Sequence, residues 1–114
     1  MQFHLNFPVT PLPEGIQYNQ QLLLMGSCFA EEIGEKLHEH RFNTLINPHG
    51  ILYNPLSITG ALTAYLDGKV YTAADLFQHN DTWNSWDHHS RFSAASPEAA
   101  LDNINRMQAA AAKA

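Results

Sequence analysis

The chain has 114 residues, of which 45% are hydrophobic and 15% are charged, so it can form one globular domain with a core but not two. Its net charge is -5 and it has no basic cluster, which argues against nucleic acid or an anionic membrane surface as a partner. No apolar run approaches the roughly 20 residues that cross a bilayer, the start lacks a signal-peptide pattern, and the one cysteine cannot form an internal disulfide. We therefore expect a cytoplasmic protein.

The first segment alternates apolar and polar side chains over residues 3–9, which is typical of a half-buried strand. Three prolines within residues 8–13 remove backbone donors, so the segment is expected to be an edge strand or an extended arm. Glu14-Gly15 then marks a turn.

Residues 21–40 predict a strand, a sharp turn and a helix. The apolar run of residues 22–25 suits a buried parallel strand, and Gly26-Ser27-Cys28 suits a tight turn. Apolar residues then recur every four positions, as on one face of a helix, at Phe29, Ile33 and Leu37.

The middle of the chain predicts a second strand and a second helix. Residues 42–46 form the candidate strand, and Asn47-Pro48-His49-Gly50 is a strong turn signal. Asn54-Pro55 starts a helix, which Asp67-Gly68 ends. The predicted apolar face of that helix contains Ile58, Leu62, Tyr65 and Leu66.

The last third predicts a short cap, a hairpin and a final helix. Thr72 and Asp75 have the spacing of a brief capping box. Residues 77–93 suggest a hairpin that turns at Asn80-Asp81. Ser96-Pro97-Glu98 opens a helix that continues to Ala114, with Leu101, Ile104 and Met107 on one side.

A strand followed by a crossover helix requires a parallel partner strand, so the fold class is α/β. Two or three candidate strands are few for a parallel sheet that must be covered on both faces. We therefore expect residues 1–114 to be the amino-terminal portion of a single larger α/β domain, which would pack against the remainder of that domain or self-associate.

Three motifs occur in an order that resembles the GSCFA family. The first is Gly26-Ser27-Cys28-Phe29-Ala30, the second spans residues 47–58, and the third spans residues 88–93. That family is usually placed among the SGNH, or GDSL-type, hydrolases. The resemblance implies a flavodoxin-like three-layer α/β/α sandwich and hydrolysis of an ester or related acyl bond. The implied substrate is a small acylated molecule or a carbohydrate ester, without a cofactor.

The resemblance also implies roles for residues. In the GDSL-type turn, Gly26 keeps the glycine, Ser27 replaces the aspartate, and Cys28 stands where the serine nucleophile would be. Gly50 matches the glycine whose N–H faces the oxyanion. The later oxyanion asparagine and the Asp-x-x-His pair are not found before Ala114, so the general base is expected from outside this chain.

The residues themselves support chemistry at Cys28. A side chain between a strand end and a helix start lies where α/β folds place their sites, and a helix amino terminus favours the thiolate, the nucleophilic form. The Cys28 and Gly50 N–H groups would stabilise the oxyanion. The alternative for Cys28 is an inert buried residue. For Ser27 the alternative to catalysis is a helix cap, which is the simpler interpretation.

The histidines are candidates for a general base beside Cys28, for substrate binding or for metal binding. His38 and His40 lie about 15 Å or more along the helix from its start, whereas His49, His88 and His89 are not excluded as partners of Cys28. We assign the following residues to oxyanion or substrate binding: Gly26, Asn47, His49, Gly50, His88 and His89. Seven histidines also allow a metal-binding module, and a non-catalytic domain that binds a ligand or acts as a scaffold is a further alternative.

Overall fold

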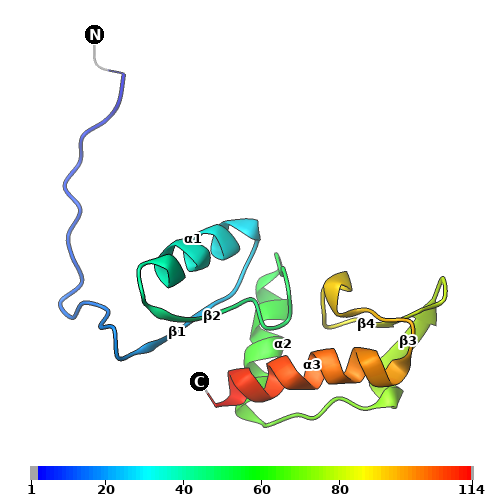
Figure 1. The fold of residues 1–114 in the computed structure, drawn as a ribbon. Coiled ribbons are helices and arrows are strands. Elements are labelled where there is room, and N and C mark those ends of the chain that lie inside the picture. The colour runs from blue at the N-terminus through cyan, green and yellow to red at the C-terminus, as the bar shows by residue number, and fades with distance from the viewer. Residues whose placement is uncertain (1–2, 114) are drawn as a thin grey trace.

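A computed structural model describes residues 3–113, which form two small sheets and three α-helices (Figure 1). The α/β class is thereby confirmed. The strands are β1 (Gln21–Leu24), β2 (Asn43–Ile46), β3 (Leu76–His79) and β4 (Thr82–Ser85); the helices are α1 (Cys28–Glu39), α2 (Pro55–Leu66) and α3 (Pro97–Ala112). Two short 3-10 turns, Ala73–Asp75 and Ser90–Phe92, precede β3 and follow β4.

The first half of the chain is a β1-α1-β2 unit with parallel strands, as predicted. Leu23 lies opposite Leu45 in the register of the pair. Helix α1 packs close to the strands at Gly34, where an added Cβ would lie 2.7 Å from an Ile46 side-chain carbon. A glycine is therefore what lets the helix approach the sheet so closely.

The predicted apolar face of α1 is wrong in detail. Phe29 is 72% exposed and Ile33 is also exposed, whereas Gly34 is buried. The close approach at Gly34 turns a face of small side chains toward the sheet, so the larger residues one position away point to solvent.

The predicted face of α2 is confirmed in part. Tyr65 is buried and Ile58 is half-buried, as predicted, whereas Leu66 is 89% exposed and Leu62 is exposed. Ala61 and Tyr65 form a core with Ala111 of α3, against which Leu23 and Leu45 of the strands pack. The buried face is thus completed by a small residue, Ala61, that the periodicity of large apolar residues did not include.

The helix boundaries follow their predicted caps. Asn54 caps α2 by accepting a hydrogen bond from the Leu56 N–H at 2.8 Å. Gly68 follows α2 with φ of 64°, and Ser96 caps α3. Helix α3 ends at Ala112, and Ala114, to which the helix was predicted to extend, lies outside the described residues.

The hairpin and the cap before it are also confirmed. β3 and β4 are antiparallel, and Asn80 and Asp81 turn between them with φ of 48° and 61°, as a two-residue hairpin loop requires. The Thr72–Asp75 capping box forms. A second core below the hairpin contains Tyr71, Phe92 and Ile104.

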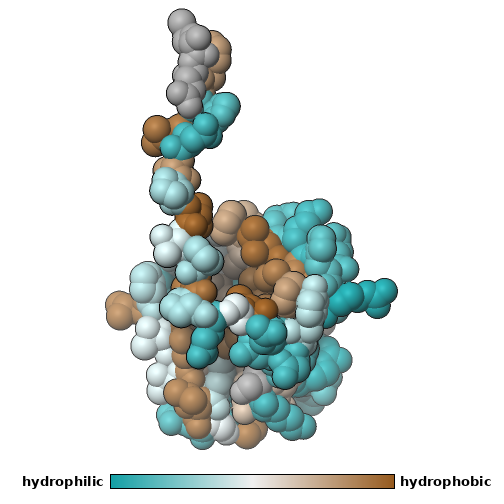
Figure 2. All heavy atoms as spheres, turned by 90° about the vertical axis from the view of Figure 1, so that its left-hand side faces the viewer, coloured by the Kyte–Doolittle hydropathy of each residue, from teal (hydrophilic) through white to brown (hydrophobic). Residues whose placement is uncertain are grey.

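Residues 3–19 contain no strand, so the half-buried strand predicted over residues 3–9 is wrong and the extended arm is what forms. The arm runs away from the body (Figure 1), and apolar and polar side chains alternate along it in the open (Figure 2). Phe3 is 87% exposed and Val9 is 80% exposed. No helix within residues 3–113 is long and apolar enough to cross a membrane.

Candidate functional site

Cys28 is the first residue of α1 and follows β1 by one tight turn. Ser27 caps the helix, because its Oγ accepts a hydrogen bond from the Phe29 N–H at 3.2 Å. Cys28 is exposed. Within residues 3–113 no backbone carbonyl accepts from the Cys28 N–H, which is one of the donors that a helix start leaves unpaired. The turn therefore presents a thiol and a free donor to solvent.

Asn47 ties this turn to two other segments. Its Oδ1 accepts from the Gly26 N–H at 2.8 Å, and its Nδ2 donates to Glu31 Oε1 of α1 at 3.3 Å. Arg91 pairs with the same Glu31 oxygen at 2.8 Å. Asn47 is 3% exposed and has φ of 43°. The first two sequence motifs thus meet through one buried amide, and Arg91 of the third motif joins them through Glu31.

Gly50 closes the bend that begins at Asn47. Its N–H donates to the Asn47 carbonyl at 2.8 Å. Its φ is 81°, and an added Cβ would lie 2.3 Å from the His89 Cβ. The His89 N–H in turn donates to the His49 carbonyl at 2.9 Å. For Gly50 to donate to an oxyanion, its N–H would have to exchange its present bond.

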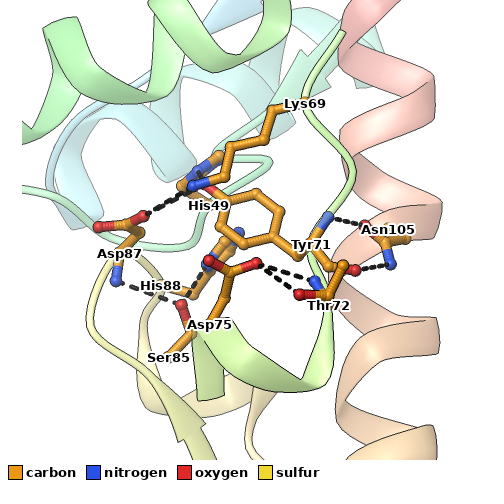
Figure 3. A network of polar contacts seen from close by, with 9 residues as sticks. All are labelled: His49, Lys69, Tyr71, Thr72, Asp75, Ser85, Asp87, His88 and Asn105. Carbon is orange, nitrogen blue, oxygen red and sulfur yellow. Dashed lines mark hydrogen bonds and ion pairs between the residues drawn. The ribbon is translucent and has the colours of Figure 1, made fainter.

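His49 is 2% exposed and lies at the centre of a polar network (Figure 3). Its Nδ1 is hydrogen-bonded to the Tyr65 hydroxyl, and its Nε2 lies 3.4 Å from the Tyr71 hydroxyl. The Tyr71 hydroxyl donates to Asp87 Oδ2 at 3.3 Å. A carboxylate only accepts, so the Tyr71 hydroxyl uses its own proton for Asp87, and its oxygen accepts a hydrogen bond from the Nε2–H of His49. The Nδ1 of His49 is then unprotonated and accepts from the Tyr65 hydroxyl.

His88 stacks on His49 with ring centroids 4.0 Å apart. Burial lowers the pKa of His49 to about 4, an effect that Asp87 opposes and Lys69 strengthens. Burial, together with His49 and Lys69, lowers the pKa of His88 to about 3. Both rings are therefore neutral at neutral pH, and both are weak general bases, because an effective base has a pKa near the working pH.

The tyrosines of the network keep their protons. Burial raises the pKa of Tyr65, and the neighbouring Tyr71 raises it further. Burial also raises the pKa of Tyr71, and the Asp87 carboxylate acts in the same direction. Both hydroxyl groups therefore serve as hydrogen-bond donors, in agreement with the direction assigned to each bond.

A pocket of about 540 Å³ opens beside this network. One wall is α2, with small residues such as Gly60 and Ala61, and the opposite wall runs from Trp86 to His89. His49, Lys69 and Tyr71 also line it. Cys28 is not among the lining residues.

The predicted site residues therefore fall into two groups. Gly26, Ser27 and Cys28 gather with Asn47, whereas His49, His88 and His89 line the pocket with other residues. His38 and His40 are in the last part of α1 and at its end, away from the Cys28 turn. Within residues 3–113 no three His, Cys, Asp or Glu side chains gather as a metal site, so nothing supports the metal-binding module.

Five functional candidates were missed from the sequence: Glu31, Tyr65, Lys69, Tyr71 and Asp87. Tyr65 was predicted only as part of the apolar face of its helix. The contacts of Tyr71 with His49 and Asp87 span 22 and 16 residues. No local pattern indicates such long-range pairs.

The profile of the GSCFA family matches residues 21–114. No curated protein and no solved structure matches the chain.

Proposed function

The chain belongs to the GSCFA family, and from this premise we propose that it acts on an ester or related acyl bond with Cys28 as the nucleophile. The observation that carries the proposal is the exposed thiol at the first position of α1, directly beyond a parallel strand, beside an unpaired N–H. Such a position combines a nucleophile with donors for the developing negative charge.

We extend the proposal to the complete fold, a flavodoxin-like three-layer α/β/α sandwich of the SGNH type. Two observations support it. Helix α1 packs against the strands through Gly34 and Ile46, and residues of α2 and α3 pack against Leu23 and Leu45. A parallel pair with helices on both faces is the unit from which such a sandwich is built.

The proposed reaction has two steps. The Cys28 thiolate attacks the acyl carbon, a C–S bond forms, and the C–O bond to the alcohol breaks as the alcohol departs with a proton. Water then attacks the thioester, which releases the carboxylic acid and restores the thiol. The substrate is proposed to be a small acylated molecule or a carbohydrate ester.

The two predicted oxyanion donors differ in availability. The Cys28 N–H is unpaired within residues 3–113, whereas the Gly50 N–H already donates to Asn47. We therefore propose Cys28 N–H as the first donor and Gly50 as one that joins by exchanging its bond. Because the pKa values of His49 and His88 are about 4 and about 3, the general base is proposed to come from outside this chain.

Acylation by p-nitrophenyl acetate tests the nucleophile without a natural substrate. We expect one acetyl group on Cys28 by peptide mass mapping, formed at least about tenfold faster in the folded chain than in the urea-unfolded chain, because folding adds oxyanion donors. Cys28→Ser should lose this label. Ser27→Ala keeps the thiol but removes the cap of α1, so its folded rate should decrease. A folded rate no higher than the unfolded rate would contradict the proposal.

A non-catalytic ligand-binding role is the second candidate, and one observation favours it. The pocket of about 540 Å³ has a size typical of small-molecule sites and does not include Cys28. If acylation shows no activation while the pocket binds a ligand, this second function is the better description.

A further inference from the structure

Trp86 is the feature of the pocket that points most directly to a ligand. Its side chain is 84% exposed, although a large aromatic side chain gains most by burial. It is nevertheless held in one orientation, because its ring stacks on Phe77 with centroids 4.2 Å apart and an interplanar angle of 18°. A fixed, exposed indole on a pocket wall offers a flat apolar surface to a bound ring.

Polar groups line the same pocket as the Trp86 indole. Asp87 uses one carboxylate oxygen, Oδ2, for both the Tyr71 hydroxyl and the Lys69 ammonium, which lies 3.9 Å away. Its other oxygen, Oδ1, has no hydrogen bond or ion pair within residues 3–113 and can accept from a ligand. Figure 3 shows Lys69 reaching across the Tyr71 ring toward Asp87, and the ammonium lies 4.3 Å from that ring centroid. Donors and acceptors are thus fixed beside the indole.

The charges of the pocket disfavour two classes of ligand, namely anions and free acyl chains. Asp67 and Asp87 outnumber the one lysine in the lining, and both buried histidines are neutral. This balance disfavours a phosphate or another anion. A free acyl chain is disfavoured as well, because Asp67, Lys69 and Asp87 would lose hydration without gaining a partner.

We propose that this pocket binds a neutral sugar ring, with its apolar face on Trp86 and its hydroxyl groups on Asp87 and Lys69. A pyranose has one face of C–H groups and a rim of hydroxyls, each of which can donate and accept, so it matches both the indole and the charged pair. The inference narrows the substrate of the proposed function to its carbohydrate alternative and assigns the sugar ring a binding surface, but it does not require Cys28 to be catalytic.

The test uses the full chain with Cys28→Ser, so that binding is measured without thiol chemistry. Cellotriose and N-acetylchitotriose are titrated into the ¹⁵N-labelled chain, and the indole N–H signals of the two tryptophans are followed. At least one trisaccharide should shift the Trp86 signal saturably, with a Kd of about 1 mM, which is typical of a weak small-ligand site. Trp83 should shift less, because it does not line the pocket.

Variants connect the shift to the proposed contacts. Trp86→Ala should weaken binding at least about tenfold, as read from the backbone N–H signals of Gly60 and Ala64. The affinity of Trp86→Phe should lie between that of the chain with Trp86 and that of Trp86→Ala. Asp87→Asn should also weaken it. Tyr53→Ala is the matched control, since Tyr53 is 77% exposed but does not line the pocket.

Three results would overturn the inference. The first is that neither trisaccharide shifts Trp86. The second is that binding persists unchanged in the Trp86→Ala chain. The third is that adenosine, whose flat base can also stack on an indole, binds while both sugars do not. Acetylation of Cys28 can succeed or fail independently of all three.

Discussion

At the scale of single residues, the burial of two titratable rings is the feature with the clearest energetic consequence. His49 and His88 stack on each other inside the protein, and neither carries a charge at neutral pH. In an unfolded chain, a histidine has a pKa of about 6.5. The folded chain therefore binds protons at these two positions only at much lower pH than the unfolded chain does.

This difference predicts that acid destabilises the fold through the histidine pair. The folded pKa values are about 4 for His49 and about 3 for His88. Stability falls on acidification wherever the unfolded state binds more protons, so the free energy of unfolding should decrease as the pH is lowered from about 6.5 toward 4. Each of the two rings takes up its proton at least about 2.5 pH units lower in the folded chain than in the unfolded chain, and each pH unit corresponds to about 1.4 kcal/mol. The loss at pH 4 should therefore be on the order of 5 kcal/mol, measured by urea unfolding at a series of pH values.

Two variants separate this effect from general acid sensitivity. His88→Asn removes one of the buried rings, so the dependence of unfolding free energy on pH should flatten between about pH 7 and 4. His40→Asn changes an exposed histidine at the end of α1 and should leave the dependence as it is. Equal pH dependence in all three chains would contradict the prediction.

At the scale of elements, Asn47 joins segments that are distant in the sequence. It contacts the turn after β1 through Gly26 and helix α1 through Glu31, and Glu31 in turn holds Arg91. Asparagine suits this position because it tolerates the left-handed backbone better than most residues and because its amide both donates and accepts. The orientation of the Cys28 turn therefore depends on this amide.

Asn47→Asp should disturb the arrangement although the side chain keeps its shape. A carboxylate can still accept from the Gly26 N–H, but it cannot donate to Glu31, whose oxygen lies 3.3 Å from the present amide nitrogen. Two facing carboxylates repel each other. We expect a loss of about 1–3 kcal/mol in unfolding free energy at neutral pH and slower acetylation of Cys28.

A second substitution provides the rescue. Glu31→Gln introduces an amide that can donate to the new carboxylate in the double variant, so much of the lost stability and the acetylation rate should return. Lowering the pH should reduce the difference in unfolding free energy between Asn47→Asp and the unchanged chain, because protonation of either carboxylate removes the repulsion. If the double variant is no more stable than Asn47→Asp, the proposed link between α1 and the bend is wrong.

The elements themselves could be predicted because their signals are local. Asn54 caps α2, and Asn80-Asp81 turns the hairpin, through bonds and dihedral angles that involve only neighbouring residues. The face of α3 was also predicted, since Ile104 is in the second core with Leu101 and Met107 packed against it. The faces of α1 and α2 could be predicted only in part. Gly34 and Ala61 are buried because of what lies opposite them in the fold, and hydrophobic periodicity gives small residues little weight.

The candidate site could likewise be predicted only where its signals are local. The Cys28 turn follows from a strand, a glycine and a helix start that are adjacent in the sequence. The network of His49, Tyr71 and Asp87 depends on segments that fold together from far apart, so the sequence indicated the histidines but not their partners.

At the scale of the whole molecule, the shape is dominated by the arm. The radius of gyration is 17.4 Å, whereas a compact domain of this length has about 13 Å. The longest dimension is 57 Å and the shortest is 26 Å. The excess arises because residues 3–15 extend away from the body instead of packing on it (Figure 1).

Deletion of residues 1–15 should therefore leave the stability of the body unchanged. Every described side chain in residues 3–15 is exposed, so the deletion removes almost no buried apolar area, and unfolding free energy should change by less than about 0.5 kcal/mol. The deletion keeps Tyr18, whose ring stacks on Phe42 at a centroid distance of 4.4 Å.

Tyr18→Ala is the positive control and should lower the unfolding free energy by about 0.5–1.5 kcal/mol. Urea unfolding followed by circular dichroism measures both, and a midpoint that falls more for the deletion than for Tyr18→Ala would mean that the arm packs on the body in solution.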